Sequence, residues 1–172
     1  MVCRKLINFR YIANMEFFTI GQYFNRLYSI LLFILIIPIL AFGLLYLIAD
    51  RPGFFSFAED QLYFWYAIVF IDWAFIFVLF NKKIKIIRHR PGLGHKLHQY
   101  FRLTIVRYTL GSSGGILLAI GYYFSQEESL TILFMVTLLL MSILWPRPAK
   151  VCADLQLRGD EREMVYFRKD EF

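Results

Sequence analysis

Four long apolar runs alternate with charged segments along this chain. Each run is continuous and does not alternate between apolar and polar positions, so it predicts an α-helix and not a strand of a membrane barrel. A helix needs about 20 mostly apolar residues to cross a bilayer. The pattern therefore predicts an all-α polytopic membrane protein with four transmembrane helices, arranged as two antiparallel hairpins. The predicted spans are residues 27–49, 62–80, 103–124 and 129–145, which together form a transmembrane domain over residues 27–145.

A cytoplasmic segment of residues 1–26 precedes the first span. Its aromatic residues, among them Phe18, Tyr23 and Phe24, predict an amphipathic helix that lies in the membrane interface. Either Met1 or Met15 fits as the native start of the chain.

A tail of residues 146–172 follows the last span. The two prolines of residues 146–148 predict the end of that span, because proline interrupts helical hydrogen bonding. Beyond them, Val151 and Leu155 are spaced i, i+4, which predicts a short interfacial helix that ends at Gly159. The charged residues after this helix are expected to be mobile.

Lysine and arginine residues concentrate in three of the five segments that flank the spans. These segments hold Arg4, Lys5, Arg10 and Arg26; Lys82, Lys83, Lys85, Arg88, Arg90, Lys96 and Arg102; and Arg147, Lys150, Arg158, Arg162, Arg168 and Lys169. The two remaining loops hold only Arg51. Because cationic loops stay on the cytoplasmic side, both termini and the middle loop are predicted to be cytoplasmic.

Composition supports the same environment. Apolar residues make up 59% of the 172 residues and charged residues only 19%, whereas globular domains average about 45–50% and about 25%. This balance excludes a soluble enzyme, a disordered tail and a disulfide-rich secreted domain. The net charge of +6 lies beside the spans, so its expected partner is anionic lipid of the bilayer and not nucleic acid. Cys3 and Cys152 are both predicted on the cytoplasmic side, where thiols stay reduced.

One acidic and one basic residue lie inside the predicted spans. Asp72 interrupts the second span and Arg107 the third. Ionisable residues within a bilayer are costly and often functional. Their depths predict that the two side chains form a salt-bridged or water-bridged pair inside the bundle, with Ser112 or Ser113 donating a hydrogen bond to Asp72.

Small residues form one ridge of the third span. Arg107, Gly111, Gly115 and Ala119 recur at four-residue intervals, and Gly111-x-x-x-Gly115 is a pattern that allows two helices to approach closely. We expect this ridge to pack on the second span. The polar cluster that results has three interpretations: it only holds a hairpin together, it serves as a proton or ion relay or polar cavity, or Asp72 faces a partner subunit.

No catalytic or cofactor-binding residues are predicted. The chain contains no Gly-x-Ser-x-Gly, His-Glu-x-x-His or phosphate-loop motif, which disfavours a membrane enzyme that acts on lipid. His89, His95 and His98 share the basic loop, and His95-x-x-His98 has a metal-site spacing. No carboxylate or thiol in that loop completes a ligand set, so the histidines are interpreted as facing lipid headgroups.

The stretch 95–163 resembles a group of small uncharacterised four-helix bacterial inner-membrane proteins. The similar residues are Lys96-Leu97-x-x-Tyr100, the small patch of the third span, and Arg147-Pro148-x-Lys150-x-x-x-Asp154-Leu155. The resemblance implies a multi-pass protein of the bacterial inner (plasma) membrane. We expect a non-enzymatic structural or accessory subunit with a protein partner or a second copy. The alternative is a small oligomeric transporter or channel that uses Asp72 and Arg107.

Overall fold

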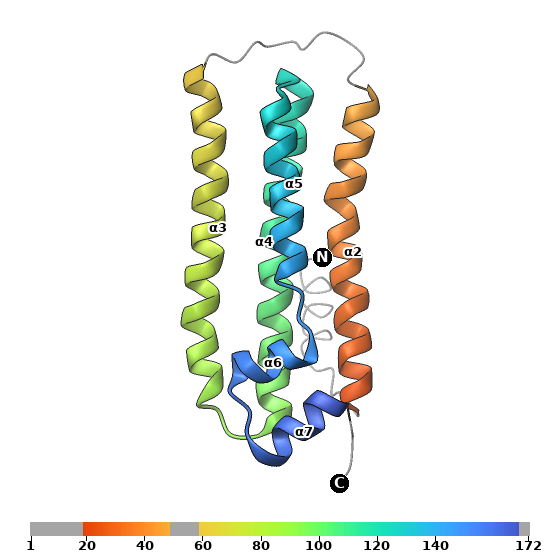
Figure 1. Ribbon diagram of the computed structural model, residues 1–172, viewed down its shortest axis with the longest axis vertical. Coiled ribbons are helices and arrows are strands. Elements are labelled where there is room, and N and C mark those ends of the chain that lie inside the picture. Colours follow the sequence, from red (N-terminus) through yellow and green to blue (C-terminus); the bar gives the residue numbers. More distant parts are fainter. Residues whose placement is uncertain (1–18, 49–58, 169–172) are drawn as a thin grey trace, which may run out of the picture.

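The computed structural model describes residues 19–48 and 59–168, which contain six helices and no strand (Figure 1). The predicted all-α class is confirmed for this part of the chain. The helices are α2 (Ile20–Ile48), α3 (Glu59–Arg88), α4 (Leu93–Ser125), α5 (Glu128–Ile143), α6 (Pro148–Leu155) and α7 (Gly159–Phe167).

Breaks between the helices occur where the local residues favour them. Gly92, with φ of 84°, precedes α4 and adopts a backbone conformation that glycine tolerates readily. Gln126, in the left-handed region, ends α4 and donates its backbone N–H to the carbonyl of Tyr122. Residues 144–147 separate α5 from α6, and Pro148 occupies the first turn of α6, where proline is favoured. The predicted break at the two prolines is therefore confirmed.

Two helices of the described part, α2 and α4, are long and apolar enough to cross a membrane. The pair α5 and α6 forms a third candidate if it is counted as one span bent by 78°. The chain is thus a helical protein with two to three candidate membrane spans. The predicted second span lies in α3, which is not among these candidates, and a count of four spans stays a prediction.

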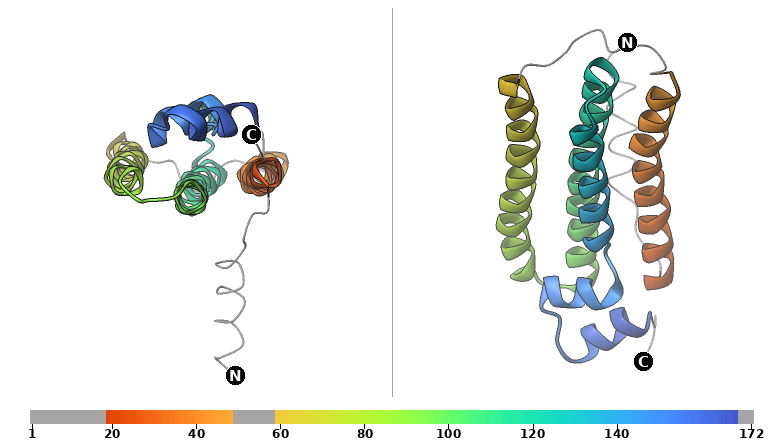
Figure 2. Two further views of the ribbon diagram at one scale, coloured as in Figure 1. Left: turned by 90° about the horizontal axis from the view of Figure 1, so that it is seen from below. Right: turned by 45° about the horizontal axis from the view of Figure 1, so that its top comes forward.

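Helix α4 occupies the centre of the molecule. Viewed from the end, α3, α4 and α2 lie in a row with α4 in the middle, and the C-terminal helices lie along one side of this row (Figure 2). Both α2 and α3 pack on α4, and α5 packs on α4 as well. The two separate hairpins predicted from the sequence are not confirmed, because α4 is the shared partner of the other three long helices.

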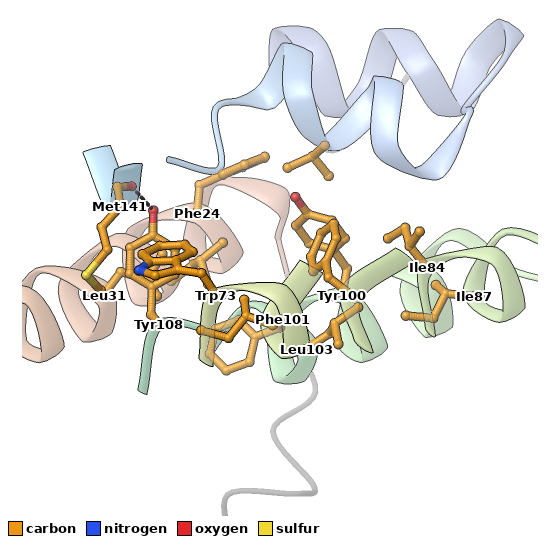
Figure 3. Close-up of a cluster of buried hydrophobic side chains, with 14 of the residues drawn as sticks. Phe24, Leu31, Trp73, Ile84, Ile87, Tyr100, Phe101, Leu103, Tyr108 and Met141 are labelled. Carbon is orange, nitrogen blue, oxygen red and sulfur yellow. Dashed lines mark hydrogen bonds between the residues drawn. The ribbon is translucent and has the colours of Figure 1, made fainter. Parts of the chain in front are cut away.

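Aromatic side chains dominate the interior at the end where α6 and α7 lie. Figure 3 shows part of this cluster, in which Phe24, Trp73, Tyr100, Phe101 and Tyr108 gather between the helices. The outward faces of α2 and α3 are apolar as well but exposed. Examples are Leu47, which is 74% exposed, and Phe70, which is 73% exposed. Apolar surface of this extent suits contact with lipid or another protein.

Two aromatic residues predicted in the N-terminal segment, Tyr23 and Phe24, lie within the described part of the chain. Residues 1–18 lie outside the described part of the chain. Tyr23 and Phe24 belong to α2 and are buried, with the Arg168 guanidinium 5.2 Å from the Phe24 ring. These two aromatics thus pack against the protein, and an interfacial helix in this segment stays a prediction.

The short helix predicted around Val151 and Leu155 is confirmed as α6, with both side chains buried. Helix α6 ends at Leu155 and not at Gly159. Gly159 instead begins a further helix, α7. The charged residues after Gly159 are expected to be mobile, but those at positions 160–163 are helical, because Val165 of the same helix is buried and fixes α7 against the molecule.

Candidate functional site

The small residues of α4 lie in contacts with three different helices. A Cβ atom on Gly111 would lie 3.4 Å from Met141 Cε of α5, and one on Gly115 would lie 3.1 Å from Pro38 Cβ of α2. Ala119 is fully buried. This ridge therefore faces α2 and α5. Our expectation that the ridge packs on the second span is therefore wrong. Residues spaced four apart drift around a helix, so Gly111, Gly115 and Ala119 turn progressively away from the side of Arg107.

Gly114, which the four-residue ridge did not include, is the small residue that faces Asp72. A Cβ atom on Gly114 would lie only 2.9 Å from Asp72 Oδ2. Because Gly114 follows Arg107 by seven residues, the two share one face of α4, about 10 Å apart along its axis. Asp72 is half-buried at this contact between α3 and α4.

Asp72 and Arg107 form no salt bridge with each other. Among the described residues, the ion pair is formed by Lys96 and Glu161. The Arg107 guanidinium lies over the Phe80 ring, 4.4 Å from its centroid. Asp72 lies beside Gly114, which is about 10 Å from Arg107 along α4. The predicted salt bridge between Asp72 and Arg107 is therefore not formed, and a pair bridged by water stays a prediction.

The two serines of α4 bind backbone carbonyls and not Asp72. Ser112 Oγ donates to the Ile34 carbonyl of α2 at 3.1 Å, and the exposed Ser113 Oγ donates to the Leu110 carbonyl of its own helix at 2.7 Å. The expected hydrogen bond to Asp72 is therefore wrong. Ile34 lies four residues before Pro38, and proline has no N–H with which to satisfy that carbonyl within α2. Ser112 supplies the missing donor from α4.

Arg107 is enclosed between α3, α4 and the C-terminal helices. It is 7% exposed, and its Nη2 atom has no hydrogen-bond partner among the described residues. Its electrostatic neighbours are Tyr100, Tyr108 and Asp154. A buried guanidinium with an unsatisfied N–H group is costly unless something compensates it.

Asp154 of α6 joins three helices, a role that its place in the resemblance did not indicate. Its Oδ2 atom accepts a hydrogen bond from Tyr100 Oη at 2.9 Å, and its backbone carbonyl accepts one from Arg88 Nε at 2.6 Å. Figure 3 shows the Tyr100 hydroxyl directed toward the C-terminal helices. The i, i+4 spacing of Lys96 and Tyr100 is the sequence signal for this contact, because it places both on one face of α4. Lys96 pairs with Glu161 of α7 at 2.9 Å.

A groove of about 480 Å³ lies between α3 and α4. Its polar lining residues are Lys83 of α3 and Gln99, Arg102 and Arg107 of α4. The remaining lining residues are apolar: Ile76, Leu79, Phe80, Ile86, Ile87, Leu103, Val106 and Leu110. All of the charged side chains that line the groove are therefore cationic.

The histidines make local contacts. His89 Nδ1 lies 2.8 Å from the Lys85 carbonyl, and His95 Nε2 lies 2.8 Å from Gln99 Nε2. Among residues 19–48 and 59–168, no group of three or more His, Cys, Asp or Glu side chains is arranged to hold a metal ion.

Cys152 is buried in α6, and its thiol lies 3.8 Å from the Arg162 carbonyl. Burial raises the pKa of this thiol, because the charged thiolate is disfavoured away from water. Cys3 lies outside the described residues. The structure therefore presents Cys152 as a packing residue of α6.

Comparison of the chain with protein-family models, with curated proteins and with solved structures found no match.

Proposed function

We propose that this chain is a multi-pass integral membrane protein without enzymatic activity, which serves as a structural or accessory subunit in the bacterial inner membrane. The start of α2, the turn between α3 and α4, and the helices α6 and α7 all lie at one end of the molecule (Figure 1). The described basic residues of the middle loop and of the C-terminal helices belong to this end, which supports a cytoplasmic position for it. These cations meet lipid headgroups and not nucleic acid.

The observation that carries the proposal is the use of polar groups inside the helices. Ser112 Oγ donates to the Ile34 carbonyl, and Tyr108 Oη donates to the Met141 carbonyl at 2.8 Å (Figure 3). Both hydrogen bonds join α4 to a neighbouring helix. Interhelical hydrogen bonds of this kind hold membrane helices together, where burial of apolar surface gives little driving force. The polar side chains thus serve assembly.

The exposed apolar faces of α2 and α3 provide the surface for a partner. Both helices lie at the ends of the row, with α4 on the inner side of each (Figure 2). Leu40 and Leu44 on α2, and Ile71 and Phe75 on α3, are exposed. A second copy or another subunit can pack there.

Native mass spectrometry of the protein, purified in mild detergent, tests this proposal. We expect a homo-oligomer of the 20.5 kDa chain, or a complex with another subunit in fixed stoichiometry. A particle that stays monomeric over the full range of protein concentration would overturn the proposal.

The second candidate is a small oligomeric transporter or channel. It is favoured by the half-buried carboxylate of Asp72, which lies inside α3 against Gly114. Proteoliposomes with an internal pH-sensitive dye, containing the wild type or the Asp72→Asn variant, separate the two functions. An accessory subunit gives no Asp72-dependent flux, whereas a transporter gives flux that the variant abolishes.

A further inference from the structure

The groove between α3 and α4 combines cationic and apolar side chains. Lys83 and Arg102 line it together with Ile86, which lies nearer the α3–α4 turn than Lys83, and Ile76 and Leu110 line it deeper along the helices. Seven residues separate Ile76 from Lys83, which is about 10 Å along α3. Cations beside apolar walls on this scale match the headgroup and the first part of the acyl chain of a lipid.

Arg107 gives this groove a fixed cation. The side chain is more than nine-tenths buried, and its Nη2 atom has no partner among the described residues. The ring of Phe80, which also lines the groove, holds the guanidinium in place at 4.4 Å. Guanidinium N–H groups match phosphate oxygens in geometry and charge. An anion in the groove would supply the acceptor that Arg107 lacks.

The open side of the groove faces outward from the helix pair. Val106 of α4 is 51% exposed, and Ile86 of α3 is exposed too. A soluble phosphate would gain nothing from these apolar walls, whereas an acyl chain would be covered by them.

We propose that the α3–α4 groove binds one anionic phospholipid, with its phosphate among Lys83, Arg102 and Arg107 and an acyl chain along Leu79 and Val106. This binding site goes beyond the proposed function, because it holds whether the chain is an accessory subunit or a transporter.

Native mass spectrometry of delipidated protein in detergent measures this binding directly. The probes are phosphatidylglycerol, phosphatidylcholine with the same acyl chains, and glycerol phosphate. We expect one phosphatidylglycerol per chain, retained more strongly than phosphatidylcholine, and no binding of glycerol phosphate. Equal retention of the two lipids would overturn the proposal, and glycerol phosphate that competes for the site would show an anion site without a lipid tail.

Three variants separate the groove from general surface charge. Arg107→Gln removes the buried cation and should weaken phosphatidylglycerol binding by about fivefold or more, since one cation near an anionic lipid contributes about that much. Val106→Trp keeps every charge but fills the apolar wall, and we expect a similar loss. Lys85→Gln removes an exposed cation of α3 that does not line the groove, and should leave binding unchanged.

Thermal unfolding of each variant identifies any that fail to fold. If Arg107→Gln fails to fold, Val106→Trp, whose position is exposed, decides the test. Equal losses for Arg107→Gln and Lys85→Gln, or full binding by Val106→Trp, would show that lipid binds by surface charge only. A dimer that Val106→Trp converts to a monomer, with stoichiometry independent of lipid, would assign the groove to a second copy and overturn the proposal.

Discussion

The hydrogen bond from Ser112 of α4 to the Ile34 carbonyl of α2 allows a quantitative test of how these helices are joined. Pro38 lacks the N–H that would bind the Ile34 carbonyl within α2, and Ser112 Oγ binds that carbonyl instead. In a bilayer, an unsatisfied carbonyl has no water to bind. Ser112→Ala should therefore destabilise the protein only because residue 38 is proline.

The expected magnitude follows from two limits. Leaving a buried polar group unpaired costs about 1–3 kcal/mol. Interhelical hydrogen bonds in membranes average about 0.6 kcal/mol, because the polar groups find other partners when the bond is lost. We expect Ser112→Ala to lower the free energy of unfolding by about 1 kcal/mol in the wild-type background, taken between these limits.

Pro38→Ala supplies the missing backbone N–H. Its own effect combines a restored helical hydrogen bond with a smaller side chain at the Gly115 contact, so the informative quantity is the coupling. In the Pro38→Ala background the Ile34 carbonyl has a donor within α2, and Ser112→Ala should cost nearly nothing. The coupling free energy should therefore approach the full effect of Ser112→Ala, about 1 kcal/mol.

Unfolding in detergent with increasing dodecyl sulfate, followed by circular dichroism, measures all four members of the cycle. Ser113→Ala is the matched control, because Ser113 is exposed and binds only a carbonyl of its own helix. Additive losses of Ser112→Ala and Pro38→Ala would refute the reasoning, and so would equal losses for Ser112→Ala and Ser113→Ala.

Three further predictions test other contacts of the fold. Gly115→Ala should destabilise the protein by about 1–3 kcal/mol in the same unfolding assay, because its Cβ would lie 3.1 Å from Pro38 Cβ. Gly43→Ala, with nothing within 4 Å of its Cβ, should be neutral or stabilising, and the reverse order would contradict the helix register. Tyr100→Phe, which removes the hydroxyl bound to Asp154, should cost about 1.5–3 kcal/mol in thermal unfolding, while the exposed Tyr166→Phe should cost nothing. Cys152 should react slowly with a maleimide, because burial encloses its thiol and raises its pKa. A Cys152→Ala, Ala153→Cys variant, which places the cysteine at the exposed neighbouring position, should react far faster. Equal rates would mean that α6 does not pack as described.

Features that depend on neighbouring residues in the sequence could be predicted. The apolar runs predicted long helices, the prolines of residues 146–148 predicted a break, and the i, i+4 spacing of Val151 and Leu155 predicted α6. In each case the signal lies within a few residues of the structure it specifies. Local propensity and periodicity are enough there.

The partners of each helix could not be predicted in this way. A ridge such as Gly111 and Gly115 indicates close approach of another helix but not which one, and here it meets α5 and α2. The depth comparison for Asp72 assumed that neighbouring helices begin level with each other. In the structure Asp72 lies beside Gly114, about 10 Å from Arg107 along α4, so the two side chains differ in depth by more than this assumption allowed.

The C-terminal contacts of Asp154 were missed for a different reason. Its partners, Tyr100 and Arg88, lie 54 and 66 residues away in sequence, and only the bend between α5 and α6 brings them together. No short pattern encodes a contact between residues so far apart. The signal that was present, Tyr100 one turn after Lys96, indicated a shared face but not what would cover it.

The central position of α4 has a consequence for biogenesis. Helices α2 and α3 are synthesised before α4, yet α4 is the helix on which both of them pack. During translation α2 and α3 therefore form without their contacts to α4, and the Ile34 carbonyl gains its bond to Ser112 only after the ribosome has added almost 80 further residues. A chain stalled before α4 would present two lone helices to the membrane quality-control machinery, and completion of α4 would be the step that ends this exposure.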